Sequence, residues 1–145
     1  AVGFQHRLDD LLDFMRSERE KINGRTNLGR SEITRLQLAQ CQIDIAVARN
    51  FSYRIITLQD KGIIANYESS VQKLFSSELH QRMANTGLHG IGLHAMLYDE
   101  DDERTPDRAR WGTYYLATVS ETIGAGTSEI QRNIIATRGL SLPRG

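Results

Sequence analysis

Apolar residues recur along most of the chain at the spacing expected of amphipathic helices. Near the start they fall at i, i+4, i+7 and i+8, which places them on one face of a helix. They are Phe4, Leu8, Leu11, Leu12, Met15 and Ile22. The pattern predicts a first helix that ends near Asn23 and Gly24, because glycine suits a helix C-terminus.

The next stretch, from about Ser31 to Gln59, is apolar on two faces of one long helix. Ser31 fits its N-terminal cap. One stripe holds Leu36, Ile43, Val47 and Phe51, and the other holds Leu38, Cys41, Ile45, Ala48 and Ile55. A helix that is apolar on most of its circumference is covered from several directions. We therefore expect it to be the central helix of a bundle or to lie partly in a subunit interface.

A third helix is predicted from about Asn66 to Asn85, followed by a glycine-rich connecting loop from Thr86 to Gly92. Its apolar residues recur at helical spacing and form a core stripe. They are Val71, Leu74, Phe75, Leu79 and Met83. His80 lies within this helix. The spacing pattern of a zinc-binding histidine pair is absent around it, so we interpret it as a structural or surface residue.

A fourth helix is expected to begin at Thr105 and Pro106, because proline suits the first helical position. It ends at Gly124. Its apolar residues at successive i+4 steps, which we expect to be buried, are Trp111, Tyr115, Val119 and Ile123. The acidic run from Asp99 to Glu103 precedes it and lacks the glycine and distal glutamate of a calcium loop. We interpret that run as a solvated loop.

A fifth helix follows a turn in which Gly124 and Gly126 flank Ala125. Thr127 and Ser128 can both cap its N-terminus, and Ser128 with Gln131 three residues later fits a capping box. Gly139 fits its C-terminal stop. Such a helix start presents free N–H groups and suits an anion. Five helical segments without strand-like alternation predict an all-α, up-down helical bundle.

Composition narrows the possible partners. The 145 residues fit a single domain, residues 1–145, with its own core. Eighteen basic and eighteen acidic residues balance, which does not favour nucleic acid as a partner. There is no apolar run long enough for a membrane span. The single cysteine, Cys41, fits a reduced setting and an inert place in the core.

The eleven residues from Gly126 to Ala136 read Gly-Thr-Ser-Glu-Ile-Gln-Arg-Asn-Ile-Ile-Ala, with Leu142 and Pro143 after them. This segment resembles the C-terminal signature of the acyl-CoA dehydrogenase family. The stretch from Ser77 to Arg82 also resembles a helix of that domain. With the order of helices, the resemblance extends over the chain and implies that residues 1–145 are the all-α C-terminal domain of a longer protein.

The resemblance implies a function and a set of partners. The family introduces an α,β double bond into acyl-CoA thioesters and uses FAD as its cofactor. Because the signature lies against the FAD, the implied cofactor-binding residues are Gly126, Thr127, Ser128 and Glu129. A homo- or heterotetramer with this domain at its core, an electron-accepting flavoprotein and a cytoplasmic location (the mitochondrial matrix in a eukaryote) are also implied. Without the family's other two domains, the 145 residues are not expected to turn over substrate.

Two other family contacts with the FAD of a neighbouring subunit have weaker counterparts in this sequence. One is made by a glycine-rich loop, here from Thr86 to Gly92, which fits a plain connector equally well. The other is made by an arginine near the start of the domain. Arg7 is the available counterpart.

The catalytic base is where this sequence departs from the family. Many members carry a glutamate immediately before the Gly-Thr of the signature, and that position is Ala125, which cannot accept a proton. One alternative places the base on a helix outside this chain. A second is that the chain belongs to a non-catalytic helical oligomerisation subunit or module of a heteromeric dehydrogenase. Glu121, one helical turn earlier, is a third alternative. A stand-alone anion-binding bundle is a further interpretation.

Overall fold

The computed structural model describes residues 2–21 and 31–144, and those ranges contain helices and no strand. The α-helices are α1 (Val2–Lys21), α2 (Glu32–Asp60), α3 (Asn66–Ile91), α4 (Arg110–Glu121) and α5 (Ser128–Ile134). Short 3-10 turns span Leu93–Met96 and Pro106–Ala109, and a π-helical turn at Ile135–Gly139 extends α5. The predicted end of the first helix, at Asn23 and Gly24, lies outside the described residues.

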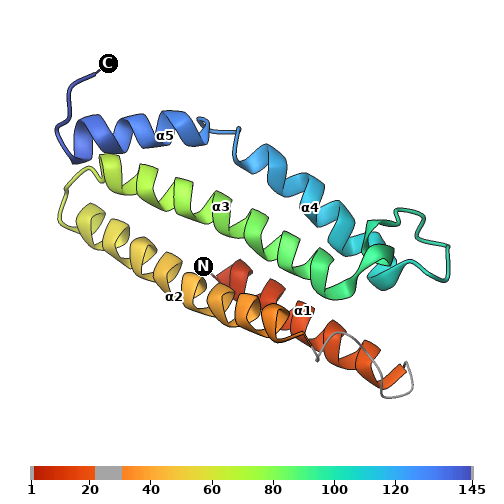
Figure 1. The fold of residues 1–145 in the computed structure, drawn as a ribbon. Coiled ribbons are helices and arrows are strands. Elements are labelled where there is room, and N and C mark those ends of the chain that lie inside the picture. The colour runs from red at the N-terminus through yellow and green to blue at the C-terminus, as the bar shows by residue number, and fades with distance from the viewer. Residues whose placement is uncertain (1, 22–30, 145) are drawn as a thin grey trace.

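The helices form the predicted up-down bundle. Figure 1 shows α3 lying between α2 on one side and a row made of α4 and α5 on the other. Helix α1 lies against both α2 and α3. The start of α2 also matches its prediction, since the Ser31 hydroxyl accepts a hydrogen bond of 3.2 Å from the N–H of Thr34. Helix α3 is therefore the element that contacts all the other α-helices.

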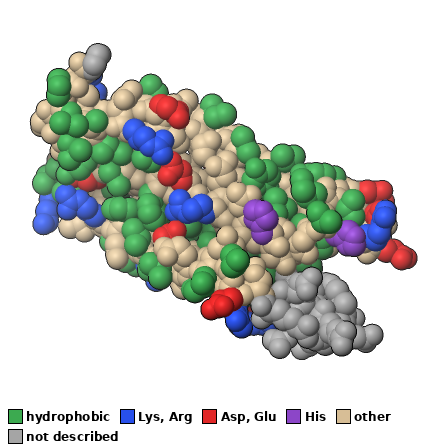
Figure 2. All heavy atoms as spheres, in the orientation of Figure 1, with side chains coloured by type: hydrophobic (Ala, Val, Ile, Leu, Met, Phe, Trp, Pro, Cys, Tyr) green, Lys and Arg blue, Asp and Glu red, His purple; other side chains and the backbone are tan. Residues whose placement is uncertain are grey.

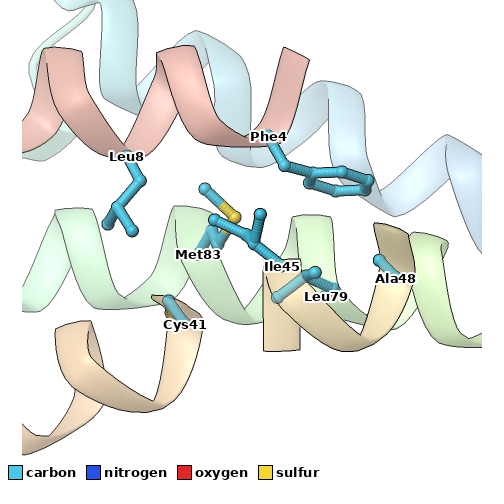
Figure 3. Packing of buried hydrophobic residues seen from close by; sticks show 7 residues of the cluster. All are labelled: Phe4, Leu8, Cys41, Ile45, Ala48, Leu79 and Met83. Atoms are coloured by element: carbon cyan, nitrogen blue, oxygen red, sulfur yellow. The ribbon is translucent and has the colours of Figure 1, made fainter. Parts of the chain in front are cut away.

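The core lies between α1, α2 and α3. Figure 3 shows side chains of α1 pointing toward those of α2 and α3. The buried cluster consists of Phe4, Leu8, Cys41, Ile45, Ala48, Leu79 and Met83. A second cluster of Leu11, Met15 and Trp111 joins α1 to α4. Burial raises the pKa of the Cys41 thiol, as expected of an unreactive core residue.

The predicted loop at Thr86–Gly92 is wrong, because α3 continues through Ile91. The glycines there serve close packing. A Cβ added to Gly87 would lie 3.0 Å from Cε3 of Trp111, and one added to Gly90 would lie 2.5 Å from Cε of Met15. Of these glycines, Gly92 has a positive φ, 94°, and it follows the helix end. Helix interiors tolerate glycine where a neighbouring element must come this close.

The predicted start of the fourth helix also needs correction. Pro106 begins a 3-10 turn whose next three residues, Asp107 to Ala109, have positive φ, and α4 begins only at Arg110. Trp111 is buried as predicted, but Val119 and Ile123 are 38% and 62% exposed. The face of α4 that packs on α3 carries Trp111, as predicted, together with Thr118, which the i+4 pattern did not include. The i+4 spacing follows a line that drifts around the helix, because four residues exceed one turn.

Candidate functional site

The turn between α4 and α5 adopts the sharp bend that its glycines predicted. Ala125 and Gly126 both have positive φ, 56° and 93°. Gly126 cannot carry a side chain in this conformation, because a Cβ would lie 2.7 Å from Nε2 of Gln131. Gly124 and Ala125 are exposed, and Gly126 and Thr127 are half-buried. The turn therefore presents its backbone at the surface of the bundle.

Of the two predicted cap residues, Thr127 caps α5 and Ser128 does not. Thr127 has the extended backbone of a cap, and its Oγ1 accepts a hydrogen bond of 3.3 Å from the N–H of Ile130. Ser128 is already helical and only 8% exposed. Its N–H donates to the carbonyl of Thr122 at 3.0 Å. Both residue types cap helices, and only the position of the extended residue distinguishes them.

Gln131 does not complete a capping box either. Its side-chain amide donates to the carbonyl oxygens of Ala125 at 3.1 Å and Gly126 at 3.4 Å. Lys73 on α3 reaches the same place, and its Nζ donates to the carbonyl oxygen of Gly126 at 2.6 Å. Sequence reasoning missed Lys73, because nothing in the local pattern around residue 73 indicates a partner 53 positions away.

Glu129 is the exposed acidic residue of the first turn of α5. Its backbone N–H and then the Thr127 hydroxyl bond to the carboxylate and hold the pKa of Glu129 below its ordinary value. Of the four predicted cofactor-binding residues, Gly126, Thr127 and Glu129 thus offer groups to the surface. The Ser128 side chain is buried in the bundle.

Glu121 ends α4 and contacts His80 of α3 through an Oε2–Nδ1 hydrogen bond. The His80 ring lies 4.1 Å from the ring of Phe4, centroid to centroid. Burial lowers the pKa of His80, and the neighbouring Glu121 carboxylate partly opposes that shift. His80 therefore fits the predicted structural role. Glu121 is partly exposed near the turn but is held by this partner.

The other candidate residues have ordinary surroundings. Arg7 lies over the ring of Tyr114, 4.4 Å from its centroid. In the acidic run, hydrogen bonds from the side chain and backbone of Arg104 lower the pKa of Asp102 to about 2.

Within residues 2–21 and 31–144, no group of His, Cys, Asp or Glu side chains is placed to hold a metal ion. None of the helices described is long and apolar enough to cross a membrane.

The comparison with known families decides the relationship. The model of the acyl-CoA dehydrogenase C-terminal domain matches residues 1–140. The chain belongs to the acyl-CoA dehydrogenase family. This membership accounts for the all-α fold and for the signature that follows the turn.

Two mycobacterial relatives of this family member are named acyl-CoA dehydrogenase IpdE1. The protein from Mycobacterium tuberculosis is 35% identical over 95 residues, which cover 64% of this chain and 23% of the relative. The protein from Mycolicibacterium smegmatis is 28% identical over 122 residues, covering 83% of this chain and 28% of the relative. The chain thus spans about a quarter of the length of these curated relatives.

A solved structure supports the same relationship. The crystal structure of the ChsE4-ChsE5 complex from Mycobacterium tuberculosis is similar with a TM-score of 0.78 and 26% sequence identity. The match covers 96% of this acyl-CoA dehydrogenase family chain and 36% of the solved chain. Almost the whole bundle therefore has a counterpart in a chain that was crystallised as part of a two-component complex.

Proposed function

We propose that residues 1–145 form the C-terminal domain of an FAD-dependent acyl-CoA dehydrogenase, and that the turn before α5 contacts the FAD. The observation that carries this proposal is the conformation of the turn. Gly126 is bent so tightly that a side chain would collide with Gln131, and the backbone around it faces the surface. A cofactor can approach such a backbone closely.

The groups available at the turn suit the oxygens and ring nitrogens of a flavin nucleotide. The carbonyl oxygens of Ala125 and Gly126 accept hydrogen bonds from Gln131 and Lys73. Within the described part of the chain, the N–H groups of Gly126 and Thr127 have no hydrogen-bond partner. The α-helical part of α5 is only seven residues long, so these individual N–H groups matter more than a helix dipole. Gly126, Thr127 and Glu129 would hold the cofactor, and Ser128 would support them from inside.

FAD, when bound, would accept the hydride that leaves the β-carbon of an acyl-CoA thioester. The contribution of this chain is to bind and orient that cofactor. Ala125, at the position of the usual glutamate, carries only a methyl group and cannot remove the α-proton. Glu121 is the nearest carboxylate that precedes the turn in sequence, but its hydrogen bond to His80 holds it against α3.

The base is therefore supplied from outside this chain, or the chain belongs to the non-catalytic subunit of a heteromeric dehydrogenase. The second alternative is favoured by Ala125 together with the similarity to a chain of the ChsE4-ChsE5 complex. In both cases we expect acyl-CoA as the substrate, an electron-accepting flavoprotein, and a tetramer to which this domain contributes the core.

Titration of the full-length protein with FAD, followed by a dye-linked acyl-CoA oxidation assay, tests the proposal. We expect stoichiometric FAD in the full-length protein, or in its complex with a partner subunit, and no turnover by residues 1–145 alone. Flavin binding without turnover until a partner subunit is added would support the heteromeric alternative. Neither flavin nor turnover under any of these conditions would favour a helical oligomerisation module with no flavin site.

A further inference from the structure

We infer that Lys73 is a positioning residue for the cofactor, acting through the peptide between Gly126 and Thr127. This inference rests on the proposed function. Lys73 lies on α3, the central helix, and its ammonium donates to the carbonyl oxygen of Gly126 at 2.6 Å. That carbonyl belongs to the same peptide as the N–H that the cofactor would contact, so the effect of Lys73 is transmitted by the backbone.

The geometry of the peptide unit explains how a hydrogen bond to the Gly126 carbonyl can orient the N–H of Thr127. A peptide is planar and trans, so its C=O and N–H point in opposite directions. Because Lys73 fixes the carbonyl of Gly126 toward α3, the N–H of Thr127 is directed away from α3. Gln131 holds the carbonyl of Ala125 at 3.1 Å in the same way, which directs the N–H of Gly126. Both N–H groups of the proposed contact therefore have defined directions.

Lys73 and Gln131 make different contributions. Gln131 belongs to α5 and moves with the turn, so it sets the internal shape of the bend. Lys73 belongs to another helix and fixes the turn relative to the bundle. This external tether matters because Ala125 and Gly126 both have positive φ, a region that is costly for alanine and is entropically unfavourable to fix for glycine.

The ammonium also brings a positive charge beside the turn. Glu129 is close enough for Lys73 to help hold the pKa of the Glu129 carboxyl down, although hydrogen bonds are the larger cause. A half-buried cation whose hydrogen bond is to a carbonyl retains most of its field. An anionic or electron-rich ligand at the turn would benefit from that field, in addition to the directed N–H groups.

The test uses the full-length protein with Lys73→Met, Lys73→Arg and Glu78→Gln. Glu78→Gln is the matched control, because Glu78 lies on the same helix and pairs with the side chain of Arg132 in α5 rather than with a carbonyl of the turn. We expect Lys73→Met to raise the FAD dissociation constant about 10-fold or more, the size expected for losing a charged hydrogen bond. Lys73→Arg and Glu78→Gln should stay within about 3-fold of the parent protein.

Amide hydrogen exchange provides a readout that does not depend on flavin. In Lys73→Met without FAD, exchange should quicken at Ser128 and Ile130, whose N–H groups are hydrogen-bonded to Thr122 and Thr127, while the amides of α1 and α2 keep their protection. Equal flavin affinity in Lys73→Met and Glu78→Gln would overturn the inference. If the parent protein binds no FAD, the proposed flavin site fails and the role of Lys73 in it fails too, even where Lys73→Met quickens exchange at the turn.

Discussion

At the scale of single residues, Gly126 is the position with the least freedom in the site. Its φ of 93° is one that side-chain-bearing residues rarely adopt, and a Cβ would lie 2.7 Å from the amide nitrogen of Gln131. That nitrogen is hydrogen-bonded to two carbonyls and is not free to move aside. Both the backbone strain and the contact oppose any larger residue here.

Gly126→Ala should therefore lower the free energy of unfolding by about 1–3 kcal/mol. Gly124→Ala is the matched control, since its φ is not positive and its nearest neighbour is the Ser120 carbonyl at 3.3 Å. We expect Gly124→Ala to cost clearly less in urea-unfolding measurements. Equal effects of the two substitutions would show that the bend at Gly126 is not the constrained one.

His80 makes the stability of the fold depend on pH in a defined direction. Its pKa in the folded protein lies below its ordinary value, chiefly because of burial, with Arg7 adding in the same direction and Glu121 opposing. Between the lowered folded pKa and the unfolded value of about 6.5, the unfolded chain binds more protons than the folded one. The stability due to neutral His80 is thus present above that window and is lost as the pH falls through it.

NMR titration of the His80 ring measures this directly, and we expect its pKa below about 6.5. In Glu121→Gln the opposing carboxylate is gone, so the pKa should fall further. His80→Gln should make the urea midpoint less sensitive to pH between about 7.5 and 5.5. A His80 pKa above the ordinary value, or one that rises in Glu121→Gln, would contradict this assignment of causes.

At the scale of helices, close packing between backbones decided where α3 ends and how α4 lies on it, which the spacing of apolar residues did not determine. Trp111 of α4 lies against Gly87 of α3, which keeps α3 helical through a stretch rich in glycine. Gly112, the next residue of α4, faces the 3-10 turn Leu93–Met96, and a Cβ there would lie 2.9 Å from the carbonyl oxygen of Ala95. These contacts join α4 to the end of α3.

Gly112→Ala should destabilise the fold by about 1 kcal/mol or more, because the clash with backbone outweighs the better helix propensity of alanine. Gly3→Ala, also in a helix, is the control. No atom lies within 4 Å of its added Cβ, so it should leave stability unchanged or raise it slightly. Thermal unfolding of both variants provides the comparison, and a neutral Gly112→Ala would mean that α4 shifts freely over the turn.

At the scale of the whole molecule, the bundle leaves apolar surface uncovered. Figure 2 shows apolar side chains at the surface both at the end where α5 and the turn between α2 and α3 lie and along α4. On α2, Leu36 and Ile43 are 64% and 57% exposed, whereas Cys41 and Ile45 on the other stripe are buried. Leu36 and Ile43 are thus available for the expected subunit interface, whereas Phe51 of the same stripe packs on Phe75 of α3.

In the full-length protein, Leu36→Glu with Ile43→Glu should convert the expected tetramer into smaller species, because charge would be placed at a buried apolar contact. Analytical ultracentrifugation measures this. Leu93→Glu, at a residue 90% exposed on a 3-10 turn outside α2, serves as the control and should leave the assembly intact. An unchanged tetramer in the double variant would place the interface elsewhere.

The sequence by itself determined the helices, their order and the family. Amphipathic spacing is a local property, and the residues from Gly126 to Ala136 are specific enough to indicate the family on their own, as the match over residues 1–140 confirmed. The bend at Gly126 was also readable from the chain, because glycine permits a backbone that other residues avoid.

The tertiary structure alone decided which residues hold that bend and which glycines turn the chain. Lys73 and Gly126 are 53 positions apart, and they meet because α3 and α5 pack side by side. Thr86 to Ile91 stayed helical because neighbouring side chains fill the space beside Gly87 and Gly90. The local propensity of a residue limits the backbone conformations that it can adopt. Contacts between segments that are distant in the sequence determine which of these conformations the chain adopts.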